Sequence, residues 1–235
     1  METSLDRSPR LVARMIGIFY ILLFASGFDQ YVFRKLVVRG DAAVTATNIQ
    51  SHQTLWLAGF AAALLGIAFY LVITALFYRL FTPVSRTLSL CAAFFSLTGC
   101  IIQAFALVFR LMPLIVLGDS AAFSAFQPDQ LHALALISLN SYVRAYDISL
   151  VFFGFYLLQL AYLVFRSTFL PRWLAPSVAL GLGWSVFLYP PLARALSPYV
   201  ALSSVGEVLL VLWLLVKGVD EQRWHEQATR TRAAR

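Results

Sequence analysis

Long apolar stretches alternate with short polar segments along the whole chain. Six of them reach or approach the length of about 20 residues that crosses a hydrocarbon core about 30 Å thick; they occupy residues 11–33, 55–78, 87–111, 142–165, 173–189 and 199–216. The fifth stretch is the shortest, because two prolines stop it at Pro190. The pattern predicts an all-α fold, a polytopic membrane protein with a bundle of six transmembrane helices in one domain over residues 1–219.

The composition agrees with this pattern. Of 235 residues, 60% are hydrophobic and 12% are charged, and the mean hydropathy is +0.79. Soluble domains contain about 45–50% apolar and about 25% charged residues. A soluble globular protein is therefore excluded, and membrane lipids are the expected surroundings. The first stretch is longer than the apolar region of a signal peptide and has no small-residue cleavage site, so we expect it to remain as a membrane anchor.

Basic residues are distributed unevenly between the two ends of these stretches. If the N-terminus is cytoplasmic, twelve of the eighteen Lys and Arg residues lie on the cytoplasmic side and six on the other. The positive-inside rule then favours cytoplasmic N- and C-termini, as an even number of spans requires. The net charge of +7 follows from this topology and requires no nucleic acid. Residues 220–235 are predicted to form a basic cytoplasmic tail that contacts anionic lipid headgroups.

Two short helices are expected outside the spans. Asp41 can cap a helix over residues 41–50 by accepting hydrogen bonds from its first-turn amides. Pro128 and Asp129 can begin a second helix over residues 128–140, which leads into the fourth span.

Small residues recur at helical spacing within two spans. Such stripes indicate close helix packing, with the lining of a ligand cavity as the alternative. They comprise Gly59, Ala63 and Gly66 in one span and Ala175, Ala179 and Gly183 in another.

Common cofactor and metal motifs are missing from the sequence. The three histidines, His52, His132 and His225, lie in separate segments, and no CxxC or HExxH motif is present. Walker, GxGxxG, GxSxG and DDxxD motifs are also missing. We therefore expect neither a metal nor a cofactor.

Polar side chains inside the spans are the strongest functional candidates, because a charged group near the bilayer centre costs a few kcal/mol. At about 1.5 Å per residue, Glu207, ten residues before Lys217, lies near the middle of the bilayer. The other candidates lie in its outer third or at the outer interface. We hypothesise an outward-opening polar cavity that binds a ligand, lined by Asp29, Gln103, Arg110, Arg144, Asp147 and Glu207.

A structural interpretation of the same residues is also open. The interfacial Arg and Asp side chains could extend toward water or pair as an external latch, and Arg144 and Asp147 share a helix face at spacing i, i+3. Glu207 could be protonated and hydrogen-bonded to a neighbouring helix.

Several sequence segments resemble one known family. They are residues 10–20 (RLVARMIGIFY) with 36–49 (LVVRGDAAVTATNI), residues 151–154 (VFFG) with 165–172 (FRSTFLPR), and residues 206–207 (GE) with 212–219 (LWLLVKGV). Together they are similar to signatures of the bacterial integral-membrane family named domain of unknown function 4386. The resemblance covers nearly the whole chain. It implies a multi-pass protein of the bacterial inner (cytoplasmic) membrane, and it assigns no site residues.

Three functions are compatible with the sequence. The first is binding, with or without transport, of a small amphiphilic molecule or lipid in the outward-facing pocket. The second is a structural or regulatory subunit that packs against a partner membrane protein. The third is an intramembrane acid–base enzyme acting on a lipid or isoprenoid, with Glu207 and either Asp147 or Asp29 as its proton donor and base. The enzyme requires two carboxyl groups that converge on one substrate.

Overall fold

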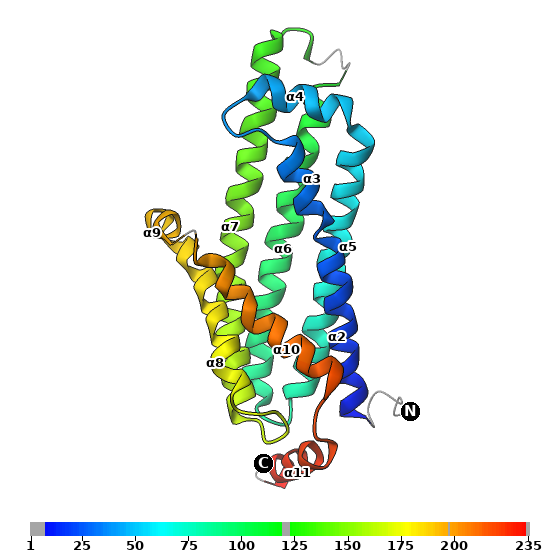
Figure 1. The fold of residues 1–235 in the computed structure, drawn as a ribbon, viewed down its shortest axis with the longest axis vertical. Helices are drawn as coiled ribbons and strands as arrows, with labels where there is room; N and C mark the ends of the chain where they lie inside the picture. The colour runs from blue at the N-terminus through cyan, green and yellow to red at the C-terminus, as the bar shows by residue number, and fades with distance from the viewer. Residues whose placement is uncertain (1–7, 119–122, 197, 234–235) are drawn as a thin grey trace. The chain divides into compact units, whose positions relative to one another are not determined.

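The computed structural model describes residues 8–118, 123–196 and 198–233, and every regular element in these ranges is a helix (Figure 1). The chain forms two compact units, which are described separately below. Unit 1 comprises Met1–Leu22, Phe69–Cys100 and Ile148–Arg235, and unit 2 comprises Leu23–Ala68 and Ile101–Asp147.

In the described ranges, four helical segments are long and apolar enough to cross a membrane. They are Pro9–Leu36, α5 (Gln53–Phe81), α6 (Arg86–Val116) and α7 (Pro128–Arg166), with 28, 29, 31 and 39 residues. Even the shortest is about 42 Å long at 1.5 Å per residue, which exceeds the hydrocarbon thickness of about 30 Å. The structure thus confirms an all-helical fold with the apolar helices of a multi-pass membrane protein, and its four candidate spans coincide with the first four predicted stretches.

The first of these segments consists of two helices. They are α2 (Pro9–Ser26) and α3 (Phe28–Leu36), which meet at Gly27. The fourth segment also differs from its predicted bounds. Because α7 runs without a break from Pro128, the short helix predicted over residues 128–140 is its first part.

The predicted fifth and sixth spans are shorter helical stretches. α8 (Leu174–Ala179) continues into the 3₁₀ helix η2 (Leu180–Leu188), and the 3₁₀ helix η3 (Val200–Ser204) continues into α10 (Val205–Val216). The short helix α9 (Pro190–Ala195) lies between the two stretches. Neither stretch alone has the length of the four long helices.

These two stretches pack against each other within unit 1 as an antiparallel pair (Figure 1). Glycine permits the close approach. A methyl group at Gly206 would lie 2.7 Å from the backbone nitrogen of Val178 and closer still to the carbonyl group of Ser177. A methyl group at Gly183 would overlap the Ser203 hydroxyl. Gly183 belongs to one of the two small-residue stripes, and its contact is the close packing that such a stripe predicts.

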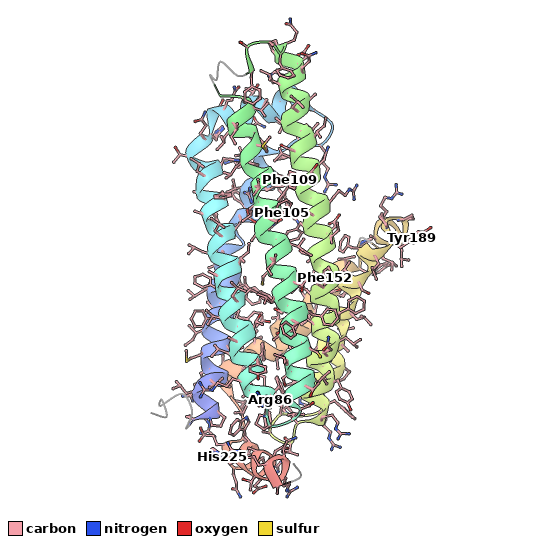
Figure 2. All side chains as sticks on the ribbon, turned by 180° about the vertical axis from the view of Figure 1, so that it is seen from behind. Arg86, Phe105, Phe109, Phe152, Tyr189 and His225 are labelled. Carbon is pink, nitrogen blue, oxygen red and sulfur yellow. The ribbon has the colours of Figure 1, made fainter. Side chains whose placement is uncertain are left out.

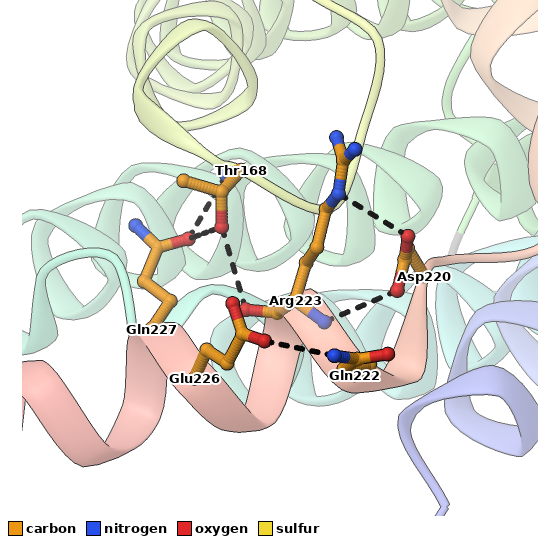
Figure 3. A network of polar contacts seen from close by, with 6 residues as sticks. All are labelled: Thr168, Asp220, Gln222, Arg223, Glu226 and Gln227. Atoms are coloured by element: carbon orange, nitrogen blue, oxygen red, sulfur yellow. Dashed lines mark hydrogen bonds and ion pairs between the residues drawn. The ribbon is translucent and has the colours of Figure 1, made fainter.

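The segment predicted to be a basic tail contains an ordered helix, α11 (Glu221–Ala233). Figure 3 shows how its first turns are held: Asp220 caps the helix by accepting from the Arg223 amide at 3.1 Å. The backbone amide of Thr168 donates to Gln227 Oε1 at 3.0 Å. Two further hydrogen bonds join Trp224 Nε1 to the Leu80 carbonyl at 2.9 Å and Thr231 to the Pro83 carbonyl at 2.8 Å. α11 therefore packs across the connection between α5 and α6 and the end of α7.

The Trp224 hydrogen bond gives a prediction for the stability of this contact. Replacing Trp224 with phenylalanine removes the donor to Leu80, and we expect α11 to dissociate more easily by about 1 kcal/mol. Amide hydrogen exchange in α11 should then be about fivefold faster, because exchange reports local opening. The exposed Trp173 provides a control in the same unit, and Trp173→Phe should leave α11 exchange unchanged. Equal exchange in the wild type and Trp224→Phe would contradict the prediction.

Unit 2 contains the predicted helix after Asp41. α4 (Ala42–Ser51) begins where the Asp41 side chain accepts from the Val44 amide at 2.9 Å, which confirms the predicted cap. The interior of the unit is a cluster of buried side chains from four helices: Val32, Leu36, Ile49, Trp56 and Leu139.

Large apolar side chains also cover much of the outer surface. Figure 2 labels Phe105 and Phe109, one turn apart on α6 in unit 2, and their rings meet edge to face at 5.7 Å. Phe105 is 63% exposed, and large aliphatic side chains such as Ile101 are exposed with it. Soluble monomers rarely expose contiguous apolar surface of this kind, whereas lipid chains cover it in a membrane.

Candidate functional site

Glu207 lies in the first turn of α10, in unit 1. The preceding glycine, Gly206, contacts the Ser177 backbone and so holds this turn against α8. Because η3 continues into α10 without a break, Glu207 lies inside one helical stretch and not at a free helix N-terminus that would stabilise its charge.

Two tyrosines from other helices donate to the same oxygen of Glu207. The hydroxyl of Tyr20 on α2 lies 3.1 Å from Glu207 Oε1, and that of Tyr70 on α5 lies 3.2 Å from it. The other oxygen, Oε2, has no hydrogen-bond partner among the residues that the structure describes. The carboxyl group can therefore accept from a further donor.

A third tyrosine completes the cluster. Tyr156 on α7 is 1% exposed, and its ring centroid is 6.3 Å from that of Tyr70. Its hydroxyl is near enough to Glu207 and Tyr20 for electrostatic interaction, but it forms no hydrogen bond of ordinary geometry to a described group. The Phe153 ring packs on Tyr70 at 4.7 Å. We call Glu207, Tyr20, Tyr70, Tyr156 and Phe153 the Glu207 site.

Glu207 is less enclosed than the tyrosines around it. Tyr20 and Tyr156 are buried, whereas Glu207 is half-buried. On other faces of α10, Val205 and Val208 are 40% and 38% exposed. Helix α10 thus presents apolar side chains outward and its half-buried acidic group toward the tyrosines.

In unit 2, two of the predicted residues form a buried ion pair. Arg110 on α6 contacts Asp29 on α3, and their side chains are 0% and 8% exposed. Gln30 donates to the other Asp29 oxygen at 3.0 Å. Both residues were predicted to line a cavity, with an external latch as the alternative, whereas in the structure they pair with each other in the interior of unit 2.

Aromatic rings surround the Arg110 guanidinium. Its central carbon lies 5.5, 4.9 and 5.7 Å from the ring centroids of Phe33, Trp56 and Tyr142, distances at which cation–π attraction operates. The Trp56 indole nitrogen also donates to the Arg110 carbonyl at 3.0 Å. Gly59 leaves room for the guanidinium, because a methyl group there would lie 2.9 Å from Nη2. These contacts account for a buried charge without requiring a ligand.

The remaining candidates are more accessible. Arg144 and Asp147 share a face of α7, as their spacing predicts, and form an ion pair at 3.4 Å with side chains 75% and 21% exposed. Gln103 on α6 is half-buried. Of the six candidates, the structure thus joins Asp29 to Arg110 and Arg144 to Asp147, whereas Glu207 belongs to unit 1 and bonds to tyrosines.

The three tyrosines were missed from the sequence, although a signal was present. Each lies at a similar distance along its helix from a basic residue: Tyr20 is six residues from Arg14, Tyr70 nine from Arg79 and Tyr156 ten from Arg166. Glu207 is ten residues from Lys217. If these basic residues mark one membrane surface, all four polar groups share a depth of roughly 9–15 Å at 1.5 Å per residue. Equal depth is the condition for them to meet.

Metal binding has no obvious site in the described part of the chain, where no three His, Cys, Asp or Glu side chains gather in a way that could hold an ion. Within this part, the chemistry available to the Glu207 site is that of one carboxyl group, three phenols and aromatic ring faces. It can accept a proton, a hydrogen bond or a positive charge.

The chain is similar to an archaeal protein and matches a protein family. A protein of Archaeoglobus fulgidus, named only "Uncharacterized protein", is 30% identical over 83 residues, which are 34% of this chain and 50% of the relative. The chain therefore matches about half the length of that relative. No solved structure matches the chain. Residues 15–218 match the family described as "Domain of unknown function (DUF4386)", and because this match covers most of the sequence, the chain belongs to that family.

Proposed function

We propose that the protein is a six-span membrane protein that binds a small amphiphilic molecule or lipid, with or without transporting it, through the Glu207 site. The single observation that carries the proposal is the arrangement of Glu207: two phenols donate to one of its oxygens, its other oxygen accepts no hydrogen bond from the described residues, and the residue is only half-buried.

The length of the 3₁₀ helices supports six spans. A 3₁₀ helix rises about 2.0 Å per residue, compared with about 1.5 Å in an α-helix. The stretch from α8 to η2 is then about 27 Å long and that from η3 to α10 about 28 Å, close to the hydrocarbon thickness of about 30 Å. The residue count alone therefore underestimates the reach of both stretches.

The distribution of positive charge supports the orientation. With six spans, the twelve Lys and Arg residues counted above lie on the side of α11, and the positive-inside rule makes that side cytoplasmic. We propose that the protein lies in the inner membrane of a bacterium with both termini in the cytoplasm.

A half-buried carboxyl group without an ionic partner favours ligand binding over the other two functions. The acid–base enzyme requires a second carboxyl group near Glu207, and the other described carboxyl groups of unit 1, Asp220, Glu221 and Glu226, all lie in or just before α11. The partner subunit would use small-residue faces, but Gly59 already contacts Arg110 and Gly183 already contacts Ser203. Neither alternative explains why Glu207 has an accessible oxygen.

Glu207→Gln tests the proposal. Glutamine keeps an oxygen that accepts from Tyr20 and Tyr70 but removes the acidic group, so the fold should survive while ligand retention falls. We expect mass spectrometry of gently purified protein to identify an amphiphile in the wild type, and its amount to fall at least about tenfold, the equivalent of 1.4 kcal/mol.

The control is Asp147→Asn, the corresponding acid-to-amide change at a carboxyl group of the exposed ion pair with Arg144. It should retain the amphiphile at the wild-type level. If no specific amphiphile accompanies either the wild type or the control, the binding proposal is wrong and the partner-subunit function becomes the better explanation.

A further inference from the structure

The Glu207 site holds an acidic group without a counter-charge. The described ion pairs are Arg110 with Asp29, Arg144 with Asp147, and Arg223 with Asp220, and none of them includes Glu207. The nearest basic residue along α10 is Lys217, about 15 Å away at 1.5 Å per residue. A carboxylate exposed to lipid costs a few kcal/mol unless something neutralises it.

The hydrogen-bonding groups of the site favour a ligand that donates. Both phenols donate to Oε1, and Oε2 is free to accept. A ligand carboxylate or phosphate would be repelled, whereas an ammonium group supplies both N–H donors and the missing positive charge. Hydrogen bonds between two charged groups are about twice as strong as neutral ones.

Ring faces provide a second, independent attraction for a cation. The half-buried Tyr70 ring lies beside the carboxyl group that it hydrogen-bonds, with the buried rings of Tyr156 and Phe153 packed on it, and aromatic rings attract cations most strongly where water is excluded. The Tyr156 hydroxyl, in a residue that is 1% exposed, faces Tyr20 and adds a further polar group to the site.

Helix α10 presents an apolar surface outward. Val205, Val208 and Leu209 are exposed on faces of α10 next to that of the half-buried Glu207, so an alkyl chain in the bilayer can lie against α10 while its head reaches around the helix to the carboxyl group. From these observations we infer that the Glu207 site binds the ammonium head of an amphiphile that enters sideways from the membrane. This inference rests on the proposed binding function and specifies its ligand class.

Three amphiphiles with one hydrocarbon chain test the inference. We propose to measure binding of radiolabelled oleylamine, oleyl alcohol and oleic acid to the protein in phosphatidylglycerol nanodiscs, which lack ammonium headgroups. Oleylamine should bind saturably and at least about tenfold more tightly than the other two, since a desolvated cation–π contact contributes about 2 kcal/mol. Glu207→Gln should weaken oleylamine binding by at least about tenfold through loss of the opposite charge.

Two further variants make the measurement decisive. Glu226→Gln makes the same chemical change on α11 and should bind oleylamine as the wild type does. Should Glu207→Gln fail to fold, Tyr70→Phe removes one of the two phenol hydroxyls at the carboxyl group, and we expect a severalfold loss of oleylamine affinity.

The outcomes separate this inference from the proposed function. Oleyl alcohol or oleic acid binding as tightly as oleylamine, and losing affinity in Glu207→Gln, would overturn the ammonium inference while leaving ligand binding intact. Oleylamine binding that is equal in the wild type and Glu207→Gln would also overturn the ammonium inference. The proposed function has its own test, the mass spectrometry of the ligand that the purified protein retains.

Adding phosphatidylethanolamine to the nanodiscs shows which molecule supplies the ammonium group. Competition with oleylamine indicates a lipid headgroup, and undiminished binding of oleylamine indicates a free lipophilic amine. Both results support ammonium recognition.

Discussion

Replacing Asp29 with alanine is expected to destabilise unit 2 by about 3–5 kcal/mol, because it leaves the Arg110 charge buried without its partner. Arginine cannot relieve this cost by losing its proton, since it stays protonated at all physiological pH values. The three surrounding rings attract the cation but do not neutralise it. Thermal unfolding of the purified protein in mild detergent, followed by circular dichroism, measures the effect.

A double variant separates the ion pair from the packing around it. Asp29→Ala combined with Arg110→Leu removes both charges, and we expect it to recover most of the stability that Asp29→Ala loses, because a buried pair replaced by apolar side chains is often tolerated. Asp147→Ala is the matched control, since the exposed pair with Arg144 should contribute only about 0–1 kcal/mol. Similar unfolding temperatures for Asp29→Ala and Asp147→Ala would contradict the prediction, because they would mean that Arg110 does not need Asp29 as its buried counter-charge.

The four long helices could be predicted from the sequence because span length is a local property. An apolar run longer than the bilayer is thick must be helical, whatever it packs against. The short stretches after Trp173 could not be described so well. Gly181 in η2 packs closely on Leu157 of α7, and no local sequence pattern reveals such a contact between distant residues.

The polar residues were found more reliably than their partners. Depth along a helix singled out Glu207 as an acidic group within an apolar stretch, and spacing on one helix predicted the Arg144–Asp147 pair. Neither depth nor spacing could predict which residues pair between different helices. Asp29 meets Arg110 because α3 packs beside α6 within unit 2, and depth alone cannot specify which helices are neighbours.

The helix after Asp220 shows a different limit. Its composition is polar and none of its residues is buried, so no apolar periodicity distinguishes it from a solvated tail. It is held instead by hydrogen bonds from Trp224 and Thr231 to backbone carbonyls of Leu80 and Pro83. Such contacts depend on the shape of the partner and are invisible in a single sequence.

Gly206→Ala is expected to disrupt the packing of α10 on α8 and to remove ligand binding with it. The added methyl group would overlap the Ser177 carbonyl and lie 2.7 Å from the Val178 nitrogen, both backbone atoms that cannot move without shifting a helix. We expect a loss of about 1–3 kcal/mol in stability, although alanine is the better helix former. Because Glu207 is the next residue, the shift should also separate its carboxyl group from Tyr20 and Tyr70 and reduce amphiphile retention.

Gly17→Ala is the control that separates the backbone clash at Gly206 from the general effect of replacing a buried glycine. Gly17 is likewise a buried glycine in a helix of unit 1, but the three atoms nearest to a methyl group there all belong to the side chain of Leu215, which can change its rotamer, and not to a backbone. Its unfolding temperature should therefore remain within a few degrees of the wild type, since a change of 1 kcal/mol moves the midpoint by about 2–4 °C in a chain of this size. Equal stability of Gly206→Ala and Gly17→Ala would mean that α10 can move away from α8 at little cost. That result would contradict the predicted loss of stability, whereas amphiphile retention in Gly206→Ala would still report whether the shift separates Glu207 from Tyr20 and Tyr70.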